Sequence, residues 1–225
     1  MTNTLHRFGP IESLVDDYIV FAIPARGKND QHAIEKQRRF LELARKHNPV
    51  NLGDASHGSV FQPSKNLNPM VHWNRSDDRD ADAVIRGVSC PTTVAAVFDQ
   101  TDSVVAFIKD LQQEDLGLSI NISAALDKAE ECARRAGLKP HSIEYSLGFF
   151  GQTDRMADRR TLELSTMCGH GMLSFGFVQK LIERVKQGRR TPEQASATMA
   201  RFCGCGVFNP SRACRILEDC RVGKP

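Results

Sequence analysis

The chain lacks the features that mark a membrane, secreted or nucleic-acid-binding protein. Its first seven residues contain no apolar stretch, and no hydrophobic run approaches the length of a membrane-spanning helix. Thirty basic residues are scattered among 27 acidic ones, which gives a net charge of +3 without a basic patch. We therefore expect a cytoplasmic protein with no membrane and no nucleic-acid partner.

Glycine-rich phosphate loops and dinucleotide fingerprints are also missing, so no bound nucleotide is expected. With 40% hydrophobic and 25% charged residues, the composition is that of an ordinary globular protein. A chain of 225 residues can bury a core as one domain or as a core with a smaller second lobe. The cysteines number seven, which is odd, and in a reducing compartment such residues bind metals or catalyse reactions more often than they form disulfides.

Hydrophobic spacing predicts strands that alternate with helices through most of the chain. Apolar runs at 18–23 and 94–98 predict strands, as does the alternation of apolar and polar residues at 118–122 and 143–147. A last short strand is expected at 162–164. Strands joined by single helices are typical of βαβ crossovers, so the sequence predicts an α/β fold with a parallel or mixed sheet covered by helices.

The chain is expected to divide into two parts. Residues 1–166 form the α/β core, which includes a long loop at about 48–92 that is either a lid over a site or an irregular surface excursion. Residues 167–225 form a lobe of three short helices. The last two of these helices begin after Thr191 and Asn209, because each of these residues can cap a helix and precedes a proline.

Cys168 stands in the string Met167-Cys-Gly-His-Gly171, where a strand is expected to give way to a helix. Glycines on both sides of His170 allow a sharp turn. A thiol at a helix N-terminus lies near free N–H groups and the positive end of the helix dipole, and both favour the thiolate. Cys168 is therefore a candidate metal ligand or nucleophile, and the alternative is a buried cysteine in a tight turn.

A second pair of cysteines, Cys203 and Cys205, is separated by one glycine and followed by another. Two thiols this close can face one metal centre only in a tight turn, which the glycines permit. Structural zinc sites more often space their cysteines two to four residues apart, so an iron–sulfur cluster fits this spacing better than zinc. The alternative is an inert pair in a glycine-rich connector.

Together, Cys168, Cys203 and Cys205 predict an iron–sulfur site of the 4Fe-4S type with three thiolate ligands. Three ligands leave one iron open to act as a Lewis acid, which predicts an oxygen-sensitive lyase of the dehydratase or desulfurase kind acting on a small anionic metabolite. If Cys214 supplies a fourth thiolate, the cluster is saturated and serves electron transfer or structure instead. The sequence leaves this choice open, together with the choice between zinc and iron.

Further polar residues are candidates for proton transfer and anion binding. His170, or one of the loop histidines His57 and His72, is the candidate proton donor. Arg155 is the candidate anion clamp, because a guanidinium can hold a carboxylate through two parallel bonds. The alternatives are solvated histidines and a surface salt bridge.

The string Met167-Cys-Gly-His-Gly171 resembles the nucleophile turn of proline racemase and related cofactor-independent epimerases. The resemblance covers five residues, and it implies two cysteines, here Cys168 and Cys205, that act as acid and base across a substrate α-carbon. Cys205-Gly-Val-Phe departs from that family's glycine-rich second turn, and the chain is short for its two-lobed fold. A metal-free cysteine enzyme is thus one alternative function. Another is a non-catalytic cluster-binding or metal-binding protein that serves a partner enzyme, and a homo-oligomer is also open.

Overall fold

The computed structural model describes residues 7–63, 80–144, 146 and 148–223. The strands are β1 (Tyr18–Ile23), β2 (Asn51–Asp54), β3 (Gly58–Ser59), β4 (Gln62–Pro63), β5 (Val94–Phe98) and β6 (Ser119–Ser123). The helices are α1 (Ile11–Leu14), α2 (Ala33–Arg45), α3 (Ala81–Gly87), α4 (Thr101–Glu114), α5 (Leu126–Arg135), α6 (Arg159–Ser165), α7 (Phe175–Lys186), α8 (Pro192–Ala200) and α9 (Pro210–Arg221), with one 3-10 turn, η2 (Thr153–Arg155).

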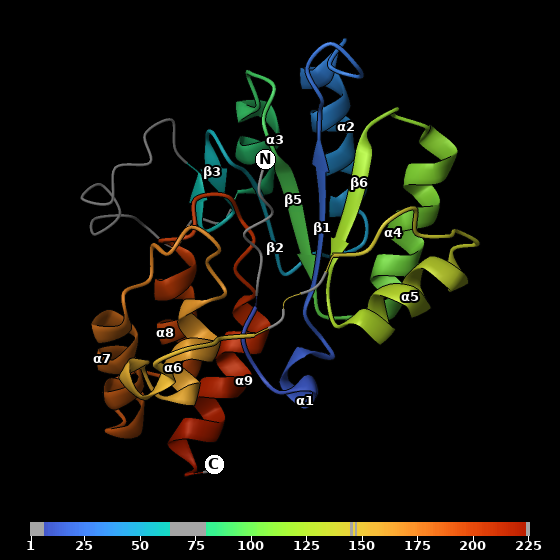
Figure 1. Cartoon of the computed structure of the whole chain (residues 1–225). Helices are drawn as coiled ribbons and strands as arrows, with labels where there is room; N and C mark the ends of the chain where they lie inside the picture. The colour runs from blue at the N-terminus through green and yellow to red at the C-terminus, as the bar shows by residue number, and fades with distance from the viewer. Residues whose placement is uncertain (1–6, 64–79, 145, 147, 224–225) are drawn as a thin grey trace.

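The strands of the described residues form one sheet in the order β4-β3-β2-β5-β1-β6, and every pairing in it is antiparallel. Strands β1 and β2 run in the same direction, but β5 lies between them. Strands β5 and β6 likewise run in the same direction, with β1 between them. The crossovers through α2 and α4 therefore each skip one strand, which is the split-βαβ, ferredoxin-like arrangement, extended at one edge by β3 and β4 (Figure 1).

The predicted parallel or mixed sheet is thus wrong, and the sheet topology explains why. Strand–helix–strand patterns require consecutive strands to run in the same direction, and β1 and β2 do so. They do not require these strands to be neighbours. Here a strand of opposite direction fills each gap, so every hydrogen-bonded neighbour is antiparallel although the crossovers are of the βαβ kind.

Helices cover both faces of the sheet. Because side chains alternate along a strand, Ile19 and Phe21 of β1 point to one face and Val20 to the other. The face of Ile19 packs against α6, α7, α8 and α9 and is called here the α9 face. The face of Val20 packs against α2, α4 and α5 and is called the α2 face. Figure 1 shows the C-terminal helices α6 to α9 gathered together on one side of the sheet.

The three helices predicted for the C-terminal part are present as α7, α8 and α9. The strand predicted at 162–164 is wrong, because these residues belong to helix α6. Asp158 caps that helix by accepting a hydrogen bond from the N–H of Thr161 at 3.0 Å. The strand predicted at 143–147 is also wrong for its described residues, which are exposed and irregular.

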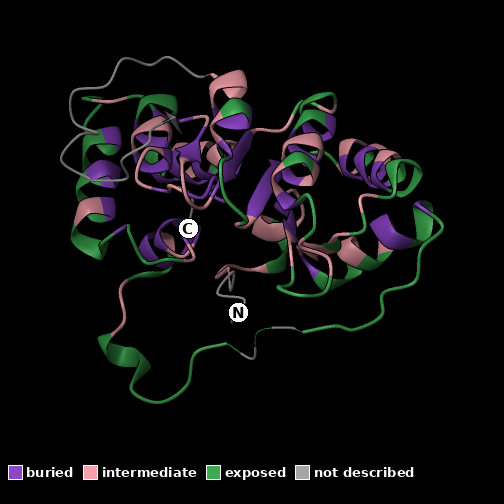
Figure 2. Ribbon diagram, turned by 90° about the horizontal axis from the view of Figure 1, so that it is seen from above, coloured by how far each residue is buried: buried purple, intermediate pink, exposed green. Residues whose placement is uncertain are grey.

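The segment 48–92, expected as a long loop, contains β2, β3, β4 and α3 among its described residues. Residues 64–79 lie outside the described part of the chain, and the candidate His72 is among them. Among the described residues, the longest exposed stretch is the connector from α5 to α6, whose described residues between 137 and 155 are all exposed. Figure 2 shows this connector running outside the packed helices. Among the described residues, no helix is long and apolar enough to cross a membrane.

The C-terminal helices contact the sheet backbone to backbone through two glycines. Gly53 of β2 faces the turn at Cys205, and a Cβ atom at Gly53 would lie 2.6 Å from the Cys205 carbonyl carbon. Gly206 has φ +75°, and a Cβ atom there would lie 2.5 Å from the Gly53 nitrogen. Real Cβ contacts are longer than this, so both positions require glycine if the turn is to lie against β2.

Replacement of Gly206 by alanine should destabilise the protein by about 3 kcal/mol or more, because it combines a left-handed backbone with a clash against β2. Gly188 is the matched control. It also has a positive φ, of +68°, but open space surrounds its Cβ position, so Gly188→Ala should cost only about 1 to 2 kcal/mol of strain. Urea denaturation of both variants measures the difference. Equal losses would mean that the contact between Gly206 and Gly53 is not tight.

Candidate functional site

Cys168 lies in the turn that follows α6, and α7 begins only at Phe175. The expected strand-to-helix junction is therefore a helix-to-loop junction. The turn meets the C-terminal end of α6, where the helix dipole disfavours a negative charge. The side chain is nevertheless enclosed, since Cys168 is only 2% exposed. The predicted lowering of the Cys168 pKa is wrong, because its hydrogen bond to Cys203 and its burial raise that pKa.

Cys203 and Cys205 lie in the turn that joins α8 to α9. Helix α8 ends at Ala200, whose carbonyl accepts a hydrogen bond from the N–H of Cys203. The N–H of Gly206 then donates to the Cys203 carbonyl, which closes a tight turn with both cysteines inside it. Cys203 is fully buried and Cys205 is 7% exposed.

The two turns bring three cysteines and one histidine together in a row. The Sγ atoms of Cys203 and Cys205 are 3.8 Å apart, and the Cys205 Sγ lies 3.5 Å from Nδ1 of His170. Cys168 makes a side-chain hydrogen bond with Cys203 at the other end. The order of contact is therefore Cys168, Cys203, Cys205 and His170.

This row orders the acidities of the three thiols. The hydrogen bond that Cys168 donates to Cys203, together with burial, raises the pKa of Cys168. The bond from Cys168 lowers the pKa of Cys203, but the bond that Cys203 gives to Cys205 and its own burial outweigh this and raise its pKa to about 12. The bond from Cys203 lowers the pKa of Cys205 despite burial. Of the three thiols, Cys205 is the one whose pKa is lowered.

Backbone N–H groups also face each sulfur. Those of Met172 and His170 donate to the Cys168 sulfur, and the donors to Cys203 and Cys205 are the N–H groups of Phe208 and Val207. Each of these bonds lowers the pKa of the thiol that accepts it. Amide donors directed at cysteine sulfurs stabilise a thiolate, and such bonds also tune metal–thiolate centres.

The side chains as placed form a row and not a cage. Among the described residues, no group of three or more His, Cys, Asp and Glu side chains has the arrangement needed to hold a metal ion. Binding one ion to three of these residues would thus require side-chain rotation.

A hollow of about 500 Å³ opens beside Cys168. Its lining comes from the turn after α6 and from the first residues of α7; it consists of Ser165, Thr166, Cys168, Gly169, Gly171, Leu173, Ser174 and Phe175. Ser174 caps α7 by accepting a hydrogen bond from the N–H of Phe177. The positive end of the α7 dipole therefore lies at this hollow, and it favours an anion there.

The other predicted residues lie at varied distances from the row. His170 is exposed at its open end. Arg155 lies on η2 in the exposed connector and lines neither the row nor the hollow as described. Cys214 lies on α9, and its thiol donates to Glu193 of α8 at 3.5 Å. Burial, more than Glu193, raises the Cys214 pKa to about 11. His57 belongs to a different cluster, at the end of β2.

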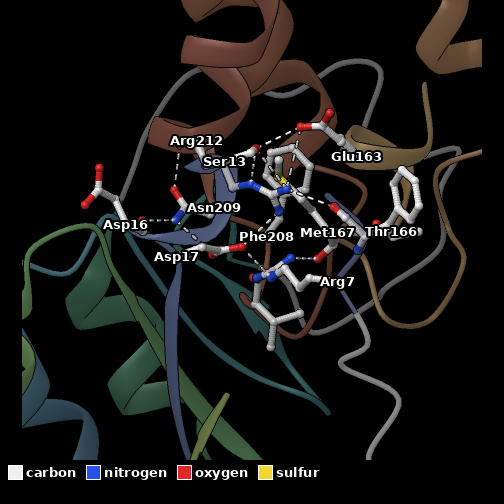
Figure 3. A network of polar contacts seen from close by, with 12 residues as sticks. Arg7, Ser13, Asp16, Asp17, Glu163, Thr166, Met167, Phe208, Asn209 and Arg212 are labelled. Carbon is white, nitrogen blue, oxygen red and sulfur yellow. Dashed lines mark hydrogen bonds and ion pairs between the residues drawn. The ribbon is translucent and has the colours of Figure 1, made fainter. Parts of the chain in front are cut away.

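A buried group of charges holds the two cysteine turns in place (Figure 3). Asp17 accepts ion pairs from Arg7 at 2.8 Å and from Arg212 at 3.0 Å. Glu163 of α6 supplies a second buried carboxylate, 3.8 Å from the Arg212 guanidinium. Glu163 also pairs with Arg159 at 2.8 Å and with Arg160 at 3.6 Å. The side chains of Asp17, Glu163 and Arg212 are at most 1% exposed. We call Arg7, Asp17, Glu163 and Arg212 the buried ion group.

Arg7 connects this group to both cysteine turns. Its guanidinium donates to the carbonyl of Met167, next to Cys168, at 2.6 Å, and also to the carbonyl of Val207, two residues after Cys205. Asn209 extends the network, because it caps α9 through the N–H of Arg212 and donates to Asp17. Figure 3 shows these side chains converging from the N-terminal segment, the α6 turn and the start of α9.

Sequence reasoning identified the cap at Asn209 but missed the buried ion group. One signal was present: Arg212 lies four residues before Ile216 and eight before Cys220, and so falls within the buried stripe of α9. A charged residue in such a stripe requires a buried partner. The partners gave no such signal, because Asp17 directly precedes the apolar run at 18–23 and Glu163 is the polar residue between the two leucines of the predicted strand at 162–164.

Comparison of the chain with family models, with curated proteins and with solved structures finds no match. A topology such as split-βαβ occurs with many unrelated activities, so the chemistry of the site alone can indicate function.

Replacement of Arg212 should greatly lower the protein's free energy of unfolding. Arg212→Met leaves the buried Asp17 with Arg7 as its remaining partner and removes the donors to the Phe8 carbonyl and Ser13, and we expect a loss of about 3 to 5 kcal/mol in the free energy of unfolding. Arg215→Met on the same helix is the control, because Arg215 and Asp16 are about half exposed and 3.7 Å apart. It should change stability by less than about 1 kcal/mol. Similar losses in chemical denaturation would contradict the role given to the buried group.

Ultraviolet absorbance of thiolates in the metal-free protein should detect one cysteine that ionises below the ordinary range. Cys205→Ser should remove that step. Cys203→Ala should move it to higher pH, because the donor that stabilises the Cys205 thiolate is gone, whereas Cys203→Ser keeps an O–H donor and should move it less. Cys90→Ser, at an exposed thiol, is the control. A low-pH step that survives in Cys205→Ser would assign the acidity to another residue.

Proposed function

We propose that the protein binds an iron–sulfur cluster through Cys168, Cys203 and Cys205 and acts as a lyase on a small anionic metabolite. The observation that carries the proposal is the row of three buried sulfurs with backbone N–H groups directed at each of them. Neutral thiols packed in a core gain little from such donors. Thiolates gain much, and three thiolates in contact require a cation among them.

A cluster suits this arrangement better than a single ion does. One tetrahedral ion needs its ligands around a common point, and the described side chains are not arranged in that way. A cluster takes each thiolate on a different iron, so its ligands need only line a shared wall. The contacts of Cys203 with both other cysteines support such a wall. Cys214 supports no fourth ligand, since its thiol is directed at Glu193.

Cys168 lines the hollow, so a cluster held by this residue would supply Lewis-acid chemistry next to it. The hollow and the N-terminus of α7 support an anionic substrate there, in place of the predicted clamp Arg155 in the exposed connector. His170 supports proton transfer, because it is exposed at the end of the row with Nδ1 near Cys205. The chain's own contribution is thus to hold the thiolates, orient the anion and supply the proton.

The metal-free alternative rests on the lowered pKa of Cys205, which suits a nucleophilic or basic thiolate. The racemase-like form of this alternative meets a geometric obstacle. An acid and a base that act on opposite sides of a carbon need room for substrate between them, and Cys203 lies between Cys168 and Cys205 in the row. The thiolate alternative therefore favours a single reactive Cys205.

Anaerobic reconstitution with iron and sulfide tests the proposal. The wild-type protein should become brown, with iron and sulfide in stoichiometric amounts, and Cys168→Ser, Cys203→Ser and Cys205→Ser should each lower the iron content several-fold. Cys90→Ser and Cys214→Ser are the controls and should retain the full cluster. A colourless, iron-free protein after reconstitution would overturn the proposal. Added small carboxylates should change the electron paramagnetic resonance spectrum of the reduced cluster, and an unchanged spectrum would argue against an open iron.

A further inference from the structure

A second cluster of reactive side chains lies at the end of β2, apart from the cysteine row. Asp54 is the last residue of β2, His57 follows in the turn to β3, and Ser89 lies in the segment between α3 and β5. Oδ2 of Asp54 is 2.7 Å from Nδ1 of His57, and Nε2 of His57 is 2.9 Å from Oγ of Ser89. Figure 1 shows β2, β3 and α3 close together at this end of the sheet.

The hydrogen bonds fix the role of each atom. Asp54 is fully buried, and its other oxygen, Oδ1, accepts the N–H of Ser56 at 2.7 Å. An ionised carboxylate only accepts hydrogen bonds, so Nδ1 of His57 carries the proton and Nε2 is left as an acceptor. The hydroxyl of Ser89 therefore donates to Nε2. This assignment follows from the network of partners.

Solvent exposure increases along the cluster from the carboxylate to the hydroxyl, so the hydroxyl, which is the candidate nucleophile, is the most accessible group. Asp54 is buried, the His57 side chain is 21% exposed, and Ser89 is exposed. The acid is thus shielded from water, which strengthens its hold on the imidazole, while the hydroxyl is accessible to another molecule. The same constellation of hydroxyl, imidazole and buried carboxylate activates serine in unrelated folds, where it is recognised by geometry and not by sequence position.

The two sites lie on opposite faces of β2. Gly53 contacts the Cys205 turn on the α9 face, and Leu52 belongs to the core of the α2 face. Side chains alternate along a strand, so the Asp54 side chain points to the same face as Leu52. The cluster at Asp54 is therefore independent of the thiols and of any metal bound there.

We propose that Ser89 is the nucleophile of an acyl-transfer site that hydrolyses esters or thioesters, with His57 as base and Asp54 as the residue that positions it. The Ser89 Oγ forms a bond to the acyl carbon while its proton passes to Nε2 of His57. The alcohol or thiol leaves with that proton. Water then attacks the acyl-serine, gives its proton to His57 and releases the carboxylic acid, and Ser89 regains its hydroxyl proton.

A fluorophosphonate probe followed by peptide mass spectrometry tests this site on the full-length protein. Ser89 should be labelled, and Ser89→Ala, which removes only an exposed hydroxyl, should abolish labelling at that peptide. His57→Gln should slow labelling by about 100-fold or more. The variant's folding is checked by circular dichroism. The rate of p-nitrophenyl acetate hydrolysis should be lower in His57→Gln than in the wild-type protein, and lowest in Ser89→Ala.

A second serine, Ser142, and the neighbouring cysteine, Cys90, serve as controls for the labelling of Ser89. Ser142 also contacts a histidine, with its Oγ 2.9 Å from Nδ1 of His141, but both residues are exposed side by side in the connector. Ser142 should remain unlabelled. Cys90→Ser removes the neighbouring exposed thiol and should leave labelling of Ser89 unchanged. Failure to label Ser89, or labelling at an equal rate in folded His57→Gln, would overturn the proposal and reduce the cluster to a structural tie between two loops. Neither result depends on iron.

Discussion

The structure depends on a cluster of charged side chains that is buried where the N-terminal segment, α6 and α9 meet. An ion removed from water must find counter-charges and hydrogen bonds, or the fold loses several kcal/mol. Arg212 meets this requirement only when the N-terminal segment brings Asp17, and α6 brings Glu163, to the first turn of α9. The charges therefore specify one way to dock the C-terminal helices on the sheet. Because Arg7 binds the carbonyls of Met167 and Val207, the same docking sets the spacing of the cysteine turns.

The cysteine row is held from a second side by the contact of Gly206 with Gly53. The buried ion group holds the two turns next to each other through Arg7, while Gly53 and Gly206 determine how closely the Cys205 turn approaches the sheet. Sulfur positions are thus decided by backbone contacts and by charges that are not themselves reactive.

The features of the structure that the sequence could predict are those that depend on residues close together along the chain. Local signals were sufficient for the caps at Thr191 and Asn209, because a cap is recognised from a few neighbouring residues. Strand neighbours are a long-range property, and nothing in a strand–helix–strand pattern reveals that β5 enters between β1 and β2. Leu162 and Leu164 were misread as a strand since two alternating leucines fit either period, and the cap at Asp158 decided for a helix. The partners of Arg212 and the serine beside His57 are far away in sequence and left no pattern to detect.

Two consecutive residues of β2, Gly53 and Asp54, belong to the two different sites. Gly53 has no side chain, so the buried cysteine turn can lie against the strand on the α9 face. Asp54, the next residue, directs a buried carboxylate to the opposite face, where it orients His57 toward an exposed hydroxyl. The sites thus differ in access to water. The row of thiols is enclosed except at His170 and the hollow, and this enclosure limits oxidation of the sulfurs. Ser89 is open to solvent instead, and hydrolysis of an acyl-serine needs such access to water. Because β2 is hydrogen-bonded to β3 on one side and to β5 on the other, the strand that the two sites share is held at both edges.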